Sequence, residues 1–174
     1  AGIEQTPENG FGATPLTKYR RHVLMLLPHT VIVFDELEAS EAVRWEWLLH
    51  SPTEFKIDAV KKTLSTDNKT KGWVAVTQLF GGHVFTLSQT DRFVVPPAIT
   101  GAEYPNQWHL TARVDGCSAT RFLAIIQIGD EAVSIINRDG DTFNVGDWTI
   151  KAVLDASKAP ELTVSHRTEQ AVFS

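Results

Sequence analysis

Cysteine is almost absent from this 174-residue chain. The single residue, Cys117, excludes an internal disulfide and therefore a small disulfide-stapled scaffold. It follows Gly116 in an expected turn, with no cysteine or histidine beside it at metal-ligand spacing. No neighbouring base marks it as a catalytic thiol, so we interpret Cys117 as incidental to function.

Long hydrophobic runs and dense positive charge are also lacking. The longest apolar run, residues 23–27, is stopped by Pro28, far short of the ~18 residues that a membrane-spanning helix needs. The net charge is −5, and the only dense basic groups, at residues 18–22 and 61–71, are short and interrupted, which predicts solvated faces. We therefore expect neither a nucleic acid nor a membrane as a partner. The start at Ala1, without a methionine or a signal-peptide pattern, favours a processed or excised chain.

The rest of the composition is that of an ordinary folded domain. Hydrophobic residues make up 43% and charged residues 21%, which argues against wholesale disorder. The length suits one domain with a substantial core, and no linker or internal repeat divides the chain. We predict that residues 1–174 form a single domain, in which residues 1–16, rich in Gly, Pro, Thr and Asn, are a loop that leads into the first strand.

Apolar and polar residues alternate with a period of two along most of the chain. The clearest segment places Trp45 and Trp47 on one face and polar side chains on the other, and residues 108–115 alternate in the same way. Such alternation is typical of antiparallel strands with one face in a core. Residues 31–34 and 122–128 are more continuously apolar and predict central strands covered on both sides. About twelve short strands in all predict an all-β, antiparallel two-sheet β-sandwich.

Turn-forming residues separate the expected strands. They occur at residues 67–72, 81–82, 115–116 and 139–140. A second irregular stretch is expected from Pro96 to Pro105, and a turn or so of helix at residues 152–159 is the only helical candidate.

The six histidines show no HExxH or HxH spacing, so they predict no shared metal site. His22 alternates onto a face with Leu24 and Leu26, where we expect a hydrogen-bonded structural histidine. His29 follows Pro28 in a predicted hairpin turn and should be exposed.

Three polar residues on one strand face are the candidate binding residues. Arg44, Glu46 and His50 lie opposite the two tryptophans, and arginine suits a carboxylate or sulfate group. This face could therefore bind an anionic sugar. The alternative is a surface charge cluster with no ligand.

Other residues are weaker candidates. Asp35 ends the apolar run 31–34, and we expect it to cap a turn by accepting backbone N–H bonds, since a metal role would need further ligands. The five tryptophans could stack on sugar rings, but their alternation with polar residues directs most of them into the core. No GxSxG, phosphate-loop or Walker motif occurs, and the sequon at residues 68–70 is of a kind common by chance.

Several segments resemble the heparinase II/III-like polysaccharide lyases. Residues 19–28 match an Arg-containing strand and its turn, and residues 31–37 match an apolar strand that ends in Asp. Residues 47–50 end in the Leu-His pair of a third strand. Gly2-Ile3-Glu4-Gln5 is similar to the Gly-x-x-Gln that follows the family's His-Asn strand, and residues 121–126 are similar to a downstream strand.

This resemblance implies that the chain is the C-terminal β-sandwich of a larger lyase, joined to an N-terminal α/α-toroid. Such lyases cleave uronic-acid polysaccharides by β-elimination, with catalytic Tyr, His and Asn or Arg groups mainly on the toroid. A further His and the ligands of a structural metal lie in upstream sandwich segments. No catalytic residue, metal ligand or cofactor is therefore assigned to this chain. The resemblance also implies an exposed sheet edge and a periplasmic or extracellular bacterial location.

Three functional hypotheses follow. The first is a lyase sandwich that acts as scaffold and as one wall of a cleft for anionic polysaccharide. The second is an independent carbohydrate-binding module without enzymatic activity, which exposed coplanar tryptophans would favour. The third is a complete small enzyme with a site assembled from scattered residues, which a polar pocket with a strongly perturbed pKa would favour.

Overall fold

The computed structural model describes residues 14–68, 73–92, 106–129, 136–167 and 169–173. The resembling segment Gly2–Gln5, the stretch 96–105, most of the leading loop and the centre of the turn at 67–72 lie outside the described residues. The part described contains twelve strands and no helix. The strands are β1 (Leu16–Leu26), β2 (Thr30–Ser51), β3 (Lys56–Asp58), β4 (Thr63–Asn68), β5 (Trp73–Gly81), β6 (Thr86–Thr90), β7 (Trp108–Gly129), β8 (Ile136–Asp139), β9 (Thr142–Val145), β10 (Trp148–Ala152), β11 (Leu162–His166) and β12 (Glu169–Phe173).

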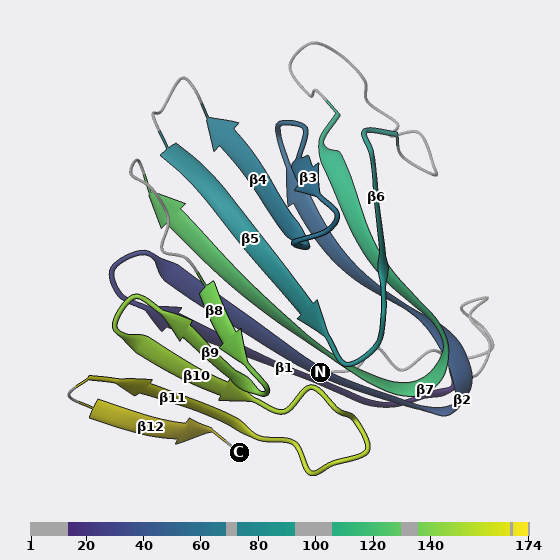
Figure 1. Ribbon diagram of the computed structural model, residues 1–174. Coiled ribbons are helices and arrows are strands. Elements are labelled where there is room, and N and C mark those ends of the chain that lie inside the picture. Colours follow the sequence, from purple (N-terminus) through teal and green to yellow (C-terminus); the bar gives the residue numbers. More distant parts are fainter. Residues whose placement is uncertain (1–13, 69–72, 93–105, 130–135, 168, 174) are drawn as a thin grey trace.

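The strands form two antiparallel sheets. The larger has the order β1-β2-β7-β5-β4-β3, with β6 paired to one half of β7, and the smaller has the order β12-β11-β10-β9-β8. Figure 1 shows the smaller sheet lying beside the larger one, next to β1 and β2. The predicted all-β sandwich is therefore confirmed.

Two 22-residue strands, β2 and β7, give the larger sheet its shape. They pair with each other along their length and bend together, as Figure 1 shows. The pairing register shifts between Glu38 and Trp45, opposite Gly116, whose φ of 73° suits a residue without a side chain. Gly116 therefore marks a bend inside one continuous strand, and the expectation that residues 115–116 separate two strands is wrong.

The bend creates two hydrophobic clusters on opposite faces of the central strands. Phe34, Leu123 and Phe143 belong to a cluster between the two sheets. Phe122 and Trp47 belong to the second cluster, enclosed by the folded larger sheet itself. Residues 122–125 are fully buried because alternate side chains enter alternate clusters, so this part of the predicted run 122–128 is a central strand covered on both sides. The far end of the run is not covered in this way, because Ile128 is 43% exposed.

The remaining turn predictions have mixed outcomes. β5 ends at Gly81, and Gly140, with φ of 58°, lies in the β8–β9 hairpin turn, as expected. His29 is exposed in the β1–β2 hairpin, also as expected. The helix expected at residues 152–159 is wrong, because β10 ends at Ala152 and the chain continues as an extended segment and a turn.

Candidate functional site

The three predicted binding residues lie together on the solvent face of β2. Arg44, Glu46 and His50 are exposed, whereas Trp45 and Trp47 between them are buried in the second cluster. Strand alternation thus places the side chains as the sequence predicted. Their role in binding remains a prediction.

Strand β7 adds charged partners that the sequence did not assign to this face. The Arg44 Nε lies 3.3 Å from Asp115 Oδ1, and the Arg113 Nε lies 2.9 Å from both oxygens of the same carboxylate. Hydrogen bonds from Arg113 and then Arg44, with their positive charges, lower the pKa of Asp115 below its ordinary value. Arg113 also faces Glu46 across the strand pair. Two guanidinium groups therefore share one carboxylate on an exposed surface.

A pair of imidazole rings continues this face. His50 pairs with His109 on β7, and their ring centroids lie 4.5 Å apart in an edge-to-face arrangement. Alternation did show that His109, Arg113 and Asp115 share one strand face. The sequence did not predict that this strand pairs with residues 43–50, because the register between strands far apart in sequence depends on the whole fold.

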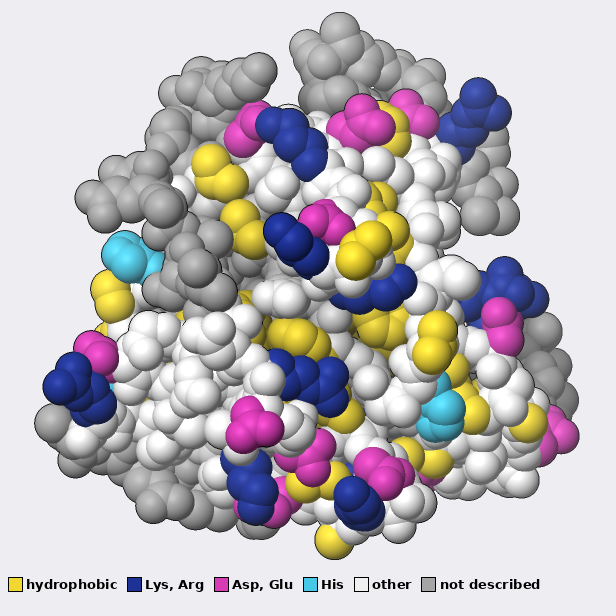
Figure 2. Space-filling model, in the orientation of Figure 1, with side chains coloured by type: hydrophobic (Ala, Val, Ile, Leu, Met, Phe, Trp, Pro, Cys, Tyr) yellow, Lys and Arg dark blue, Asp and Glu magenta, His cyan; other side chains and the backbone are white. Residues whose placement is uncertain are grey.

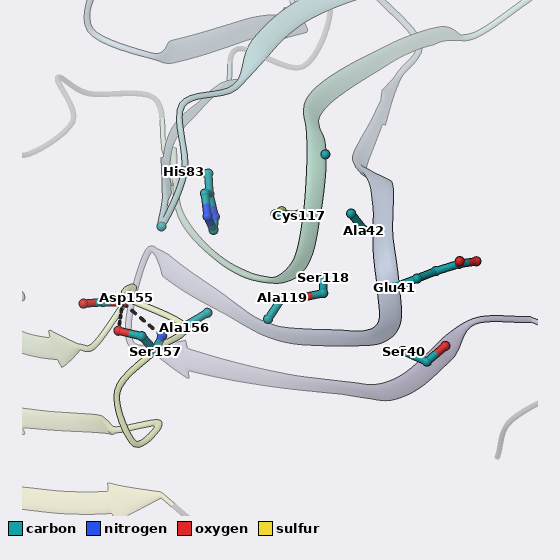
Figure 3. Close-up of a pocket in the computed structure, with 12 residues that line it drawn as sticks. Ser40, Glu41, Ala42, His83, Cys117, Ser118, Ala119, Asp155, Ala156 and Ser157 are labelled. Carbon is teal, nitrogen blue, oxygen red and sulfur yellow. Dashed lines mark hydrogen bonds between the residues drawn. The ribbon is translucent and has the colours of Figure 1, made fainter.

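A groove of about 660 Å³ opens where β2 and β7 bend, and its lining includes Gly116, which directly follows Asp115 in the chain. Its walls come from the bends of both strands, the β5–β6 loop and the turn after β10. The lining residues are Ser40, Glu41, Ala42, Gly82, His83, Gly116, Cys117, Ser118, Ala119, Asp155, Ala156 and Ser157. Figure 3 shows His83 and Cys117 above the turn that carries Asp155 and Ser157, with Glu41 directed away from them.

The polar groups of this groove are held by neighbours. His83 Nδ1 lies 3.3 Å from Thr120 Oγ1, and Asp155 accepts hydrogen bonds from the Ser157 amide and hydroxyl at 3.0 and 2.6 Å. These bonds lower the pKa of the Asp155 carboxyl. Burial raises the pKa of the Cys117 thiol, which keeps it protonated and weakens it as a nucleophile. The groove is therefore suited to binding polar groups rather than to thiol chemistry.

Arg121 fixes the turn that forms one wall of the groove. Its side chain, only 4% exposed, donates from Nη1 to the carbonyls of Val153 and Asp155, both at 2.9 Å, and from Nη2 to that of Lys158 at 2.7 Å. The adjacent Gly82 approaches so closely that a Cβ there would lie 2.1 Å from a backbone oxygen. The larger sheet thus holds the 153–158 segment by side-chain and backbone contacts.

Asp35 has a different role from the turn cap that we expected. It lies within β2, is 1% exposed, and accepts hydrogen bonds from Arg21 Nε at 2.6 Å and Nη2 at 2.8 Å. The strand does not end there with the apolar run, because β2 continues to Ser51. On the opposite face, His22 lies inward beside Phe34, 3.5 Å from Glu36, in agreement with a structural histidine.

Among the described residues, no group of three or more His, Cys, Asp or Glu side chains could hold a metal ion. No helix in the same part of the chain is long and apolar enough to cross a membrane. Figure 2 shows acidic and basic side chains interspersed over the visible face, without a continuous basic patch.

Comparison with solved structures relates this fold to a known one. No protein-family model and no curated protein matches the sequence. A solved heparinase III structure with methylated lysines aligns with a TM-score of 0.61 and 14% sequence identity, over 92% of this chain. The chain has the fold of a heparinase III domain. It spans only 23% of the length of that protein.

Proposed function

We propose that the chain is the C-terminal β-sandwich of a heparinase II/III-like polysaccharide lyase, where it serves as scaffold and as one wall of the substrate cleft. The observation that carries this proposal is the fold similarity over 92% of the chain. The segments that resemble the family in sequence support it independently. The longer protein would cleave uronic-acid polysaccharides by β-elimination in the periplasm or outside a bacterial cell, with its catalytic groups on an N-terminal α/α-toroid.

The cleft wall in this proposal is the exposed face of β2 and β7 with the adjoining groove. Arg44 and Arg113 both bind Asp115, so a carboxylate or sulfate of the glycan can bind one guanidinium while the other stays paired with Asp115. Glu46 and His50 extend the same face and can bind sugar hydroxyls. The polar groove that includes Gly116 offers further hydroxyl and backbone partners for an adjacent sugar.

An independent carbohydrate-binding module is the alternative function. Sugar-binding modules of that kind use exposed aromatic faces, but Trp45 and Trp47 are buried and Trp108 and Trp148 are half-buried. The described tryptophans therefore favour a core role over a sugar-stacking platform.

The role of the arginine face is tested in the full-length polypeptide. We expect Arg44→Ala to raise KM for the anionic polysaccharide about tenfold while kcat is unchanged, because the contact stabilises bound substrate and transition state equally. Arg167→Ala is the control, since Arg167 is an exposed, ion-paired arginine in the turn after β11. An unchanged KM for Arg44→Ala, or an equal rise for both variants, would contradict the proposed wall. Tight glycan binding by the isolated 174-residue chain would instead support the independent module.

A further inference from the structure

Two histidines face each other on the outer surface of the larger sheet. His50 on β2 lies directly opposite His109 on β7, and opposite residues of an antiparallel pair point to the same face of a sheet. Their ring centroids are 4.5 Å apart, and the ring planes are inclined at 72°. Imidazoles from two strands are therefore held within reach of one small ligand.

The separation of the rings matches the geometry of two imidazoles bound to one metal ion. A metal–nitrogen bond of about 2.0–2.1 Å, added to about 1.1 Å from the nitrogen to the ring centre, places the ion about 3.2 Å from each centroid. The centroids are then about 4.5 Å apart when the two bonds meet at a right angle, and about 5.2 Å apart at the tetrahedral angle. The observed separation corresponds to the right angle, which is the preference of Cu²⁺ and Ni²⁺ rather than of tetrahedral Zn²⁺.

One ring is anchored and the other can adjust. His109 is half-buried between β2 and β6, where Thr90 lies opposite it, whereas His50 is exposed. His109 Nε2 is a buried atom, so binding requires the rings to turn until one nitrogen of each meets the ion. The torsion that turns an imidazole ring has broad minima, so this adjustment needs no movement of the backbone.

The neighbouring positions on this face are neutral. Leu48 and Thr111 form the next pair along the two strands and separate the histidines from Arg113. Neither position supplies a carboxylate, and Ca²⁺ and Mg²⁺ require oxygen ligands. The pair therefore favours a transition metal, for which imidazole is a preferred ligand.

We propose that His50 and His109 form a two-histidine site for a divalent ion of the copper and nickel class, with water completing the coordination. Because the protein supplies only two ligands, the ion is exchangeable and its remaining positions face solvent. The inference rests on the cross-strand pair alone and does not depend on the proposed function.

Calorimetric titration of the 174-residue chain with Ni²⁺ tests the site. Ni²⁺ is the probe because a free thiol such as Cys117 does not reduce it. We expect one ion per chain, bound at least about tenfold more weakly by His50→Gln, since one of the two protein ligands is lost. His29→Gln, in the exposed β1–β2 hairpin turn, is the matched control and should bind as the unaltered chain does. No saturable binding, equal affinity of His50→Gln and the unaltered chain, or tighter binding of Zn²⁺ than of Ni²⁺ would overturn the proposal.

Diethyl pyrocarbonate labelling locates the ion in the unaltered protein. The reagent acylates an imidazole nitrogen that has a lone pair, and a metal-bound ring has none, since its second nitrogen carries a proton. Peptide mass spectrometry reads each histidine separately. Ni²⁺ far above its dissociation constant should slow the labelling of His50 at least about tenfold and leave that of His29 unchanged. Unslowed labelling of His50, or equal slowing at His29, would contradict the site. Neither measurement involves lyase activity, so its outcome is distinguishable from that of the proposed function.

Discussion

Replacing Arg121 by methionine should be among the most damaging substitutions in the domain. The guanidinium makes three hydrogen bonds to main-chain carbonyls of the 153–158 segment. A hydrogen bond to a charged group contributes about 1.5–3 kcal/mol, but burying the cation offsets part of that sum. We therefore expect the free energy of unfolding to fall by about 3 kcal/mol, because the methionine fills the volume and leaves the carbonyls without their donor.

Urea unfolding followed by tryptophan fluorescence measures this change. Arg167→Met is the matched control: its side chain is 79% exposed and makes one ion pair, so its loss should cost less than about 0.5 kcal/mol. Arg121→Lys should fall between the two, since an ammonium group cannot span all three carbonyls. A loss below about 1 kcal/mol for Arg121→Met would refute the idea that this side chain holds the wall of the groove.

Three further predictions concern the framework of the site. Arg21→Met should lower the free energy of unfolding by about 3 kcal/mol and Asp35→Asn by clearly less, because only Arg21→Met leaves a buried charge unpaired. Equal losses of unfolding free energy for the two variants in chemical denaturation would contradict this reasoning. Gly82→Ala should lower the thermal midpoint, since the added Cβ would lie 2.1 Å from a backbone oxygen, and an unchanged midpoint would contradict so close an approach. Burial tends to raise the pKa of Glu36, but the hydrogen bond and charge of Lys18 lower it below the ordinary 4.5. The ionised carboxylate therefore stabilises the fold above pH 4.5, and this contribution is lost as the pH falls through the lowered pKa. Glu36→Gln should therefore flatten the loss of stability in acid, which unfolding free energies measured across that range can check.

Alternation in the sequence was enough to predict the strands and the faces of the candidate site. Trp45 and Trp47 enter the core, and Arg44, Glu46 and His50 face solvent, because successive side chains of a strand point to opposite faces. These features are local, so they require no knowledge of which strand lies alongside.

Features that depend on long-range pairing were missed. Asp35 looked like the end of a strand, but Arg21 on the neighbouring strand neutralises it and lets β2 continue. Gly116 has the local signature of a turn, yet the long pairing with β2 carries β7 through it as a bend. The sequence did not predict the structural role of Arg121, since its three hydrogen-bond acceptors are backbone carbonyls of a distant segment. In each case the deciding partner was distant in sequence.

A paired lyase assay tests the central proposal most directly. The 174-residue chain and the full-length polypeptide are incubated separately with heparin, heparan sulfate, alginate and chondroitin, and ultraviolet absorbance records the unsaturated uronide that β-elimination produces. The account predicts product from the full-length protein with at least one of these substrates and none from the isolated chain. Product formed by the isolated chain, or no product from the full-length protein with any of the four, would contradict it.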